Sequence, residues 1–170
     1  LFDDATTDDA RLTLRVLQEA QAHGARLLNR TQLTELKRDA QGQVCGATLR
    51  GPDGFSQSVE CRCVIAATGA YLNELAVQSG LPAPKLRPLR GSHLLLPLWR
   101  LPLARAVAWS HPQDGRPVFA YPWLGALIVG TTDLDHPDLA QEPFITAPEQ
   151  AYLLQALNHA FPQAAVMARD

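Results

Sequence analysis

The fold class is indicated most clearly by one short stretch, Val64-Ile65-Ala66-Ala67-Thr68-Gly69-Ala70. Its first residues are apolar and begin with two β-branched side chains, which is typical of a strand buried on both faces of a parallel sheet. We therefore predict a strand at residues 63–67, ended by Thr68 and Gly69. Such a strand end lets the backbone pass close to a ligand, where α/β sheets bind cofactors. An ordinary strand followed by a turn explains these residues equally well.

The residues before this stretch predict a helix, a strand and a small antiparallel sheet. An amphipathic helix is expected at residues 8–23, because apolar side chains recur there at helical spacing. Its apolar stripe consists of Leu12, Val16, Leu17 and Ala20. A short strand is expected at residues 25–29. Three further strand-like runs are separated by short turn sequences, as in an antiparallel meander. These runs lie at residues 32–38, 44–50 and 55–60.

The second half of the sequence changes in character, because five prolines between residues 82 and 102 disfavour long helices there. After a short helix at residues 71–79, we expect a second antiparallel sheet, a loop at residues 133–147 and a closing helix at residues 148–160. The strands of this sheet are predicted at residues 94–98, 104–109, 116–121 and 126–131. The expected fold class is therefore α+β, an α/β segment followed by an antiparallel sheet. Its parts are residues 1–84, 85–147 and 148–170.

The composition excludes several classes of function. A hydrophobic content of 46% and a charged content of 19% are those of a globular chain. The formal net charge of -2 provides no bulk attraction for nucleic acid, so we expect no nucleic-acid partner. Cys45, Cys61 and Cys63 are expected to be free thiols, buried or half-buried, because their number is odd and no second pair at zinc spacing accompanies them. We therefore expect no metal site.

Polar residues at the starts and ends of predicted strands could carry chemistry. His93 could accept a substrate proton near neutral pH, although a hydrogen-bonded structural histidine is the commoner case. Arg90 could bind a phosphate group, or it could be an ordinary surface arginine. The hydroxyl groups of Thr131 and Thr132 could hold phosphate or cofactor oxygens, or could cap the next turn.

Seven segments, taken together and in their order, indicate a protein family more specifically than any one of them does alone. They are Asp8-Asp9-Ala10-Arg11-Leu12, Leu27-Leu28-Asn29-Arg30-Thr31, Ala67-Thr68-Gly69, Arg90-Gly91-Ser92-His93-Leu94, Val118-Phe119-Ala120-Tyr121-Pro122-Trp123, Gly130-Thr131-Thr132-Asp133, and Tyr152-Leu153-Leu154 with Asn158. This ordered set resembles the FAD-dependent glycerol-3-phosphate dehydrogenases, which are part of the wider D-amino-acid-oxidase-like flavoprotein group. The resemblance extends over nearly the whole chain.

The resemblance implies a Rossmann-like FAD domain built from discontinuous segments and a substrate domain whose antiparallel sheet lies over the flavin. It implies that sn-glycerol 3-phosphate is oxidised to dihydroxyacetone phosphate, with a hydride passing to FAD and electrons passing to quinone, or to oxygen in the oxidase relatives. The parent enzyme would be cytoplasmic, in peripheral contact with the inner face of the cell membrane. Two alternatives stay open: an FAD-dependent amine or amino-acid oxidase of the same group, and a non-catalytic interaction domain.

The same resemblance assigns roles to individual residues. His93, Thr131 and Thr132 would be catalytic, and Arg90 would bind the substrate phosphate. The residues implied to contact FAD are Leu33, Ala67, Thr68 and Gly69.

The chain departs from the family pattern in several places. The family strand end commonly reads N-A-T-G-P-W, whereas residues 66–71 here read A-A-T-G-A-Y. The family's G-x-G-x-x-G loop, an N-terminal substrate arginine and a later G-x-R-P-L segment do not occur in this sequence. We therefore expect the isolated chain neither to hold FAD tightly nor to turn over substrate, and we expect exposed strand edges to favour self-association.

Overall fold

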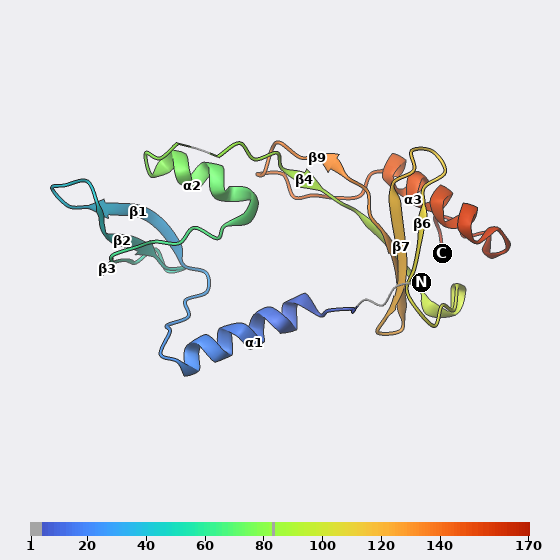
Figure 1. Cartoon of the computed structure of the whole chain (residues 1–170), viewed down its shortest axis with the longest axis horizontal. Coiled ribbons are helices and arrows are strands. Elements are labelled where there is room, and N and C mark those ends of the chain that lie inside the picture. Colours follow the sequence, from blue (N-terminus) through green and yellow to red (C-terminus); the bar gives the residue numbers. More distant parts are fainter. Residues whose placement is uncertain (1–4, 83) are drawn as a thin grey trace. The chain divides into compact units, whose positions relative to one another are not determined.

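The computed structural model describes residues 5–82 and 84–170, which divide into two compact units (Figure 1). The first unit contains the residues up to Ala67 together with Leu75–Leu81. The second contains Thr68–Glu74 and Pro82–Asp170. The expected mixture of helices and antiparallel sheet is confirmed in these units, whereas the expected parallel layer is not found in the described part of the chain.

The first unit contains helix α1, a three-stranded antiparallel sheet and the second half of helix α2. Helix α1 spans Asp9–Ala22 and begins at Asp8, whose carboxylate accepts a hydrogen bond from the Arg11 backbone at 3.0 Å. The sheet has the order β1-β2-β3, so the predicted meander is confirmed. Its strands are β1, Gln32–Arg38; β2, Val44–Arg50; and β3, Ser56–Glu60. Helix α2, Leu72–Gln78, confirms the predicted short helix.

Two strands predicted in this half are wrong. Residues 25–28 and 63–67 have no regular secondary structure, Asn29 lies in a turn, and no strand in the described residues pairs with either segment. Ile65, expected to be buried on a central strand, is 88% exposed. A strand exists only where a neighbouring strand accepts its backbone hydrogen bonds, and a local apolar run cannot supply that neighbour. Three residues of the apolar stripe of α1, Leu12, Val16 and Leu17, are likewise exposed, and no residue of that helix is fully buried in the described part of the chain.

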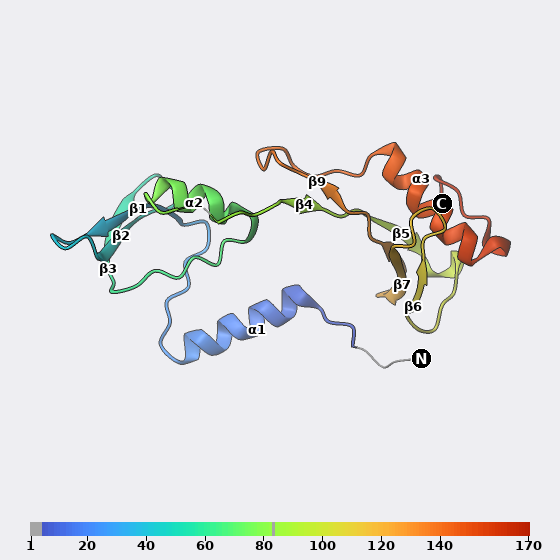
Figure 2. The ribbon, with the colours of Figure 1, turned by 45° about the horizontal axis from the view of Figure 1, so that its top comes forward.

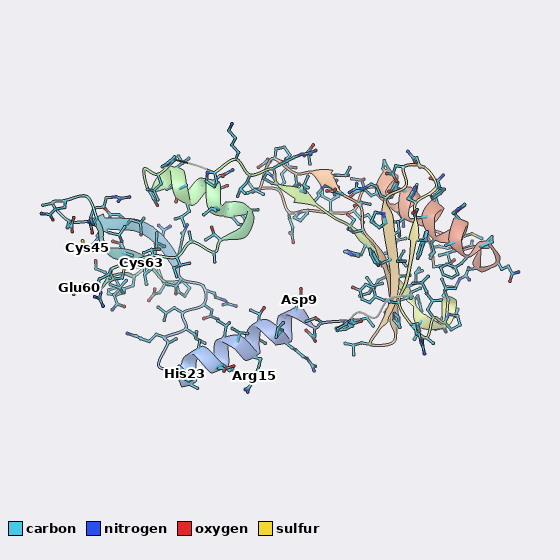
Figure 3. The ribbon with its side chains drawn as sticks, in the orientation of Figure 1. Asp9, Arg15, His23, Cys45, Glu60 and Cys63 are labelled. Carbon is cyan, nitrogen blue, oxygen red and sulfur yellow. The ribbon has the colours of Figure 1, made fainter. Side chains whose placement is uncertain are left out.

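The three cysteines lie in or near the meander. All are free thiols, and Cys61 is half-buried, but Cys45 and Cys63 are exposed, so their expected burial is wrong (Figure 3). The exposure of Cys63 follows from the missing strand, because residues 63–67 pair with no sheet in the described residues, whereas Cys45 is exposed on the paired strand β2. Among the described residues there is no cluster of three His, Cys, Asp or Glu side chains suited to a metal ion. No helix there is long and apolar enough to cross a membrane.

The second unit contains a four-stranded antiparallel sheet in the order β5-β8-β7-β6. Its strands are β5, His93–Pro97; β6, Val107–Ser110; β7, Pro117–Trp123; and β8, Ala126–Gly130. All four predicted strands are confirmed, with ends shifted by a few residues. A short antiparallel pair, β4 (Leu89–Arg90) with β9 (Leu134–Asp135), was not predicted. In the sequence β4 precedes β5 and β9 follows β8.

Helix α3, Ala147–Ala160, confirms the predicted closing helix and covers one face of this sheet (Figure 2). Its Leu153, Ala156 and Leu157 are fully buried against alternate residues of the strands. The indole nitrogen of Trp109 donates to the Ala156 carbonyl at 3.0 Å and ties β6 to the helix. The strand residues of this core are Leu94, Leu96, Val118, Ala120, Leu127 and Val129. The other face of the sheet is open, and Leu95 and Phe119 are exposed on it.

Candidate functional site

The start of β5 and the end of β8 meet at one end of the open face. His93, the first residue of β5, is paired in register with Gly130, the last residue of β8. His93 is exposed, and its imidazole lies over Gly130: a Cβ atom built there would lie 2.9 Å from both Cγ and Nε2 of the ring, and closer still to Cδ2. Gly130 is also the register partner of Phe119 on β7. The strand ends therefore present one ionisable ring beside an apolar surface.

The segments beyond these two strands are joined by short hydrogen bonds. The Thr132 backbone donates to the Ser92 carbonyl at 3.2 Å, and the Ser92 backbone donates to the Thr132 hydroxyl at 2.8 Å. Gly91 leaves room for its neighbour, because a Cβ atom on it would lie 2.9 Å from the Thr132 carbonyl oxygen and closer still to the Thr131 hydroxyl. The structure thus brings together the predicted residues His93, Thr131 and Thr132.

The two threonines differ in how much of their hydrogen-bonding capacity is free. The exposed Thr131 hydroxyl lies 2.9 Å from the Thr132 carbonyl oxygen and 3.3 Å from the Ser92 carbonyl oxygen, and it can donate to either one. Thr132 is buried, and its hydroxyl donates its hydrogen to Glu149 while accepting from Ser92. Thr131 can therefore still accept from a bound molecule, whereas Thr132 is committed to protein partners.

Glu149 is the buried centre of this region and was missed by the sequence reasoning. It is only 3% exposed, yet both of its carboxylate oxygens accept several hydrogen bonds. Oε1 accepts from the hydroxyl groups of Ser92 and Thr132, each at 2.9 Å. Oε2 accepts from the backbone and hydroxyl of Thr146, at 2.9 and 2.7 Å. The signal was present locally, because Thr146 and Glu149 form a capping box at the start of α3.

The hydrogen bonds decide the charge of Glu149. Burial alone would raise the pKa of this carboxyl group, because a low-dielectric interior disfavours the anion. The bonds from Thr146, Ser92 and Thr132 outweigh burial and lower the pKa from 4.5 to about 2. Glu149 is therefore an anion at neutral pH.

Arg90 is the counter-ion of Glu149. Its Nη1 lies 2.9 Å from Glu149 Oε2 and also donates to the Phe144 carbonyl at 2.5 Å. The side chain is 16% exposed, and its guanidinium carbon lies 6.0 Å from the centre of the Phe144 ring. The structure places Arg90 beside the predicted site, but the charge that would attract a phosphate is already balanced by a carboxylate.

Thr132 and Glu149 also line a pocket of about 540 Å³ in the second unit. Arg116 and Asp133 form an ion pair at its wall. Asp114 accepts a hydrogen bond from the Tyr152 hydroxyl at 3.0 Å. Desolvation raises the pKa of the Asp114 carboxyl group, but the hydrogen bonds from the Arg116 backbone and the Tyr152 hydroxyl outweigh it, so this pKa is lowered overall. These polar groups already have partners in the protein, and the carboxylates of the lining outnumber its one arginine, so the pocket offers no free positive charge to a phosphate.

The predicted cofactor residues are divided between the two units. Leu33 is half-buried on β1 in the first unit, and Ala67 is the last residue of that unit's first segment. Thr68 and Gly69 begin the second unit and are exposed. Gly69 has a φ of 54°, and a Cβ atom on it would meet nothing within 4 Å. Contacts of these residues with FAD stay a prediction.

Comparison with known proteins gives consistent results. The family described as FAD dependent oxidoreductase matches residues 1–170. The aerobic glycerol-3-phosphate dehydrogenase of Staphylococcus haemolyticus is 33% identical over 166 residues, which cover 96% of this chain and 30% of that protein. The corresponding protein of Staphylococcus epidermidis is 35% identical over 168 residues, with the same coverage. This chain thus spans under a third of the length of these relatives.

A solved structure agrees with these relatives. The glycerol-3-phosphate dehydrogenase from Bacillus halodurans, complexed with FAD, matches with a TM-score of 0.86 and 32% sequence identity. The match covers 96% of this chain and 33% of that one.

Proposed function

Because this chain belongs to the FAD dependent oxidoreductase family, we propose that it forms part of an enzyme that oxidises sn-glycerol 3-phosphate to dihydroxyacetone phosphate with FAD as cofactor. Support comes from relatives named aerobic glycerol-3-phosphate dehydrogenase, with 33 to 35% identity across 96% of this chain. The chain covers 30% of those proteins, so the activity of the whole is inferred from a part.

The observation that carries this proposal is the imidazole of His93 over Gly130, at the end of an open sheet face. Oxidation of a secondary alcohol removes the proton of the hydroxyl group and a hydride from the carbon that bears this group. His93 is exposed and can accept the C2 hydroxyl proton of glycerol 3-phosphate as general base. When bound, FAD supplies the hydride acceptor.

The residues proposed to hold FAD are Leu33, Ala67, Thr68 and Gly69. The backbone at Thr68 and Gly69 is exposed, and the open space beside Gly69 suits close approach by a flat cofactor ring. Thr131 is proposed to bind substrate or cofactor through its accessible hydroxyl oxygen. Thr132 contributes by fixing the backbone, since its own hydroxyl is used by Ser92 and Glu149.

Electron transfer beyond FAD is also a proposal. We propose that electrons pass to a membrane quinone and that the enzyme works in the cytoplasm, in peripheral contact with the inner face of the membrane. The support is the family resemblance alone. Reduction of a soluble quinone analogue, compared with oxygen consumption by the same preparation, distinguishes a dehydrogenase from an oxidase. Sedimentation with anionic vesicles tests the membrane contact.

The central experiment follows the visible absorbance of flavin in the complete protein that contains this chain. Purified protein should carry flavin absorbance, and anaerobic addition of glycerol 3-phosphate should bleach it. Bleaching by glycine or sarcosine instead would indicate an amine or amino-acid oxidase. Protein that never carries flavin, even after incubation with FAD, would favour the non-catalytic interaction domain and overturn the proposal.

A further inference from the structure

We propose that Glu149 is a positioning residue for the site formed by His93 and Thr131, and that Arg90 is its counter-ion rather than a free phosphate ligand. The catalytic part of this inference rests on the function proposed above. Its structural part stands on contacts within the second unit alone.

The two carboxylate oxygens of Glu149 have different partners. Oε2 completes the capping box with Thr146 at the start of α3. Oε1 is not needed for that cap, and it accepts from Ser92 and Thr132 at 2.9 Å each. A helix cap alone requires one oxygen, so the second oxygen links α3 to both strand segments.

Each of these hydroxyl groups is next in sequence to a proposed site residue. Ser92 precedes His93, and Thr132 follows Thr131. The Ser92 backbone also donates to the Thr132 hydroxyl, which closes a ring of hydrogen bonds around Oε1. The buried leucines of α3 fix this helix to the sheet. The Glu149 carboxylate, held by the helix, therefore holds Ser92 and Thr132 in place, and with them the backbone beside His93 and Thr131.

The contacts of Arg90 support the second half of the inference. Nη1 approaches both Glu149 oxygens, at 2.9 and 3.2 Å, and also the Phe144 carbonyl. A buried carboxylate requires a compensating charge, and Arg90 supplies it. Because the charge of the guanidinium is balanced by the Glu149 carboxylate, its attraction for a substrate phosphate is weak.

The test uses the complete protein with FAD bound and compares Glu149→Gln with Ser92→Ala, which removes one hydrogen bond and is the milder change. Asp114→Asn is the matched control, because Asp114 also binds a side chain of α3, Tyr152, but touches neither strand segment. We expect Glu149→Gln to lower kcat for glycerol 3-phosphate about tenfold or more, since small misplacements of reacting groups have effects of that size. Ser92→Ala should lower kcat less, and Asp114→Asn should leave it unchanged.

The Michaelis constant separates the two roles of Arg90. If Arg90 binds substrate phosphate, Glu149→Gln frees its charge and should lower KM for glycerol 3-phosphate, which would overturn the inference. If Arg90 is a counter-ion, Arg90→Gln in the Glu149→Gln background should do less harm to kcat than Arg90→Gln alone. Additive effects of the two changes would contradict the pairing.

A readout independent of activity keeps this inference separate from the proposed function. The rate at which diethyl pyrocarbonate modifies His93, followed by peptide mass spectrometry, reports the surroundings of the imidazole. We expect this rate to change in Ser92→Ala and Glu149→Gln, while the rate at the exposed His159 stays constant. Unchanged modification of His93 in folded variants would overturn the inference, even if the protein oxidises glycerol 3-phosphate. Conversely, the modification rate of His93 could change in a protein whose flavin is not reduced by glycerol 3-phosphate. That result would support the positioning role of Glu149 and refute the proposed function.

Discussion

The imidazole of His93 lies so close over Gly130 that a single methyl group at position 130 would overlap the ring. The two residues are register partners in adjacent antiparallel strands, and both face the open side of the sheet. The absence of a side chain at Gly130 therefore determines where the imidazole can rest.

Replacement of this glycine should displace the proposed general base. In Gly130→Ala, the new Cβ would lie within 2.9 Å of Cγ and Nε2 of His93, so the ring must rotate away. We expect kcat for glycerol 3-phosphate to fall about tenfold to a hundredfold. Stopped-flow measurement of flavin reduction in the complete protein checks this. In a His93→Ala background the same glycine substitution should cost nothing further, and an equal loss there would refute the steric explanation.

The charge of Glu149 should make stability depend on pH. Its pKa is lowered from 4.5 in the unfolded chain to about 2 in the fold, so the unfolded state binds the proton more readily. The resulting stabilisation, about 3 kcal/mol, is fully present above pH 4.5 and is lost as the pH falls toward 2. Urea unfolding of the wild type and Glu149→Gln between pH 7 and pH 3 measures it. The difference in unfolding free energy should be largest at neutral pH and shrink below pH 4.5; a constant difference would contradict the assignment.

The buried His111 should stabilise the contact between the β6–β7 turn and α3. Its Nδ1 accepts from the Gln113 backbone at 3.0 Å, so Nε2 carries the hydrogen and donates to the Tyr152 carbonyl at 2.9 Å. The ring also stacks on that of Tyr152, with centroids 3.6 Å apart. We expect His111→Phe, which keeps a ring but not the hydrogen bonds, to lower the unfolding free energy by about 1–3 kcal/mol. Chemical denaturation measures this, with the exposed His159→Phe as the control that should show almost no change.

The elements predicted well from sequence are those whose signal is local. The strands of the meander are separated by short turn sequences, and α3 has a helical apolar stripe, so each element can be predicted from its own stretch of sequence. The segment at residues 63–67 was predicted wrongly because burial on both faces depends on neighbours that its own sequence does not contain. The pair of β4 and β9 was missed because two residues are too few to show a period.

The site shows the same division between local and distant information. The capping box of Thr146 and Glu149 could have been recognised from a three-residue spacing. Its link to Ser92 could not, since 57 residues separate the two in the sequence and only the folded sheet brings them together. Arg90 illustrates the consequence: a motif can identify a basic residue, but not the buried carboxylate that balances its charge.

Helix α1 should drive self-association of the 170-residue chain when it is studied alone. Leu12 and Val16 are one turn apart and exposed, and the helix buries no residue within the described structure. An apolar stripe of this kind is removed from water when two copies pair. We expect size-exclusion chromatography with light scattering to show species larger than a monomer, and the double variant Leu12→Glu/Val16→Glu to shift them toward monomer. The control Gln18→Glu/Ala22→Glu adds the same charge at the same spacing on the opposite face of the helix and should have little effect. A single monomer peak for the unchanged chain would refute self-association, and an equal shift in both double variants would show that charge, rather than the loss of the stripe, is responsible.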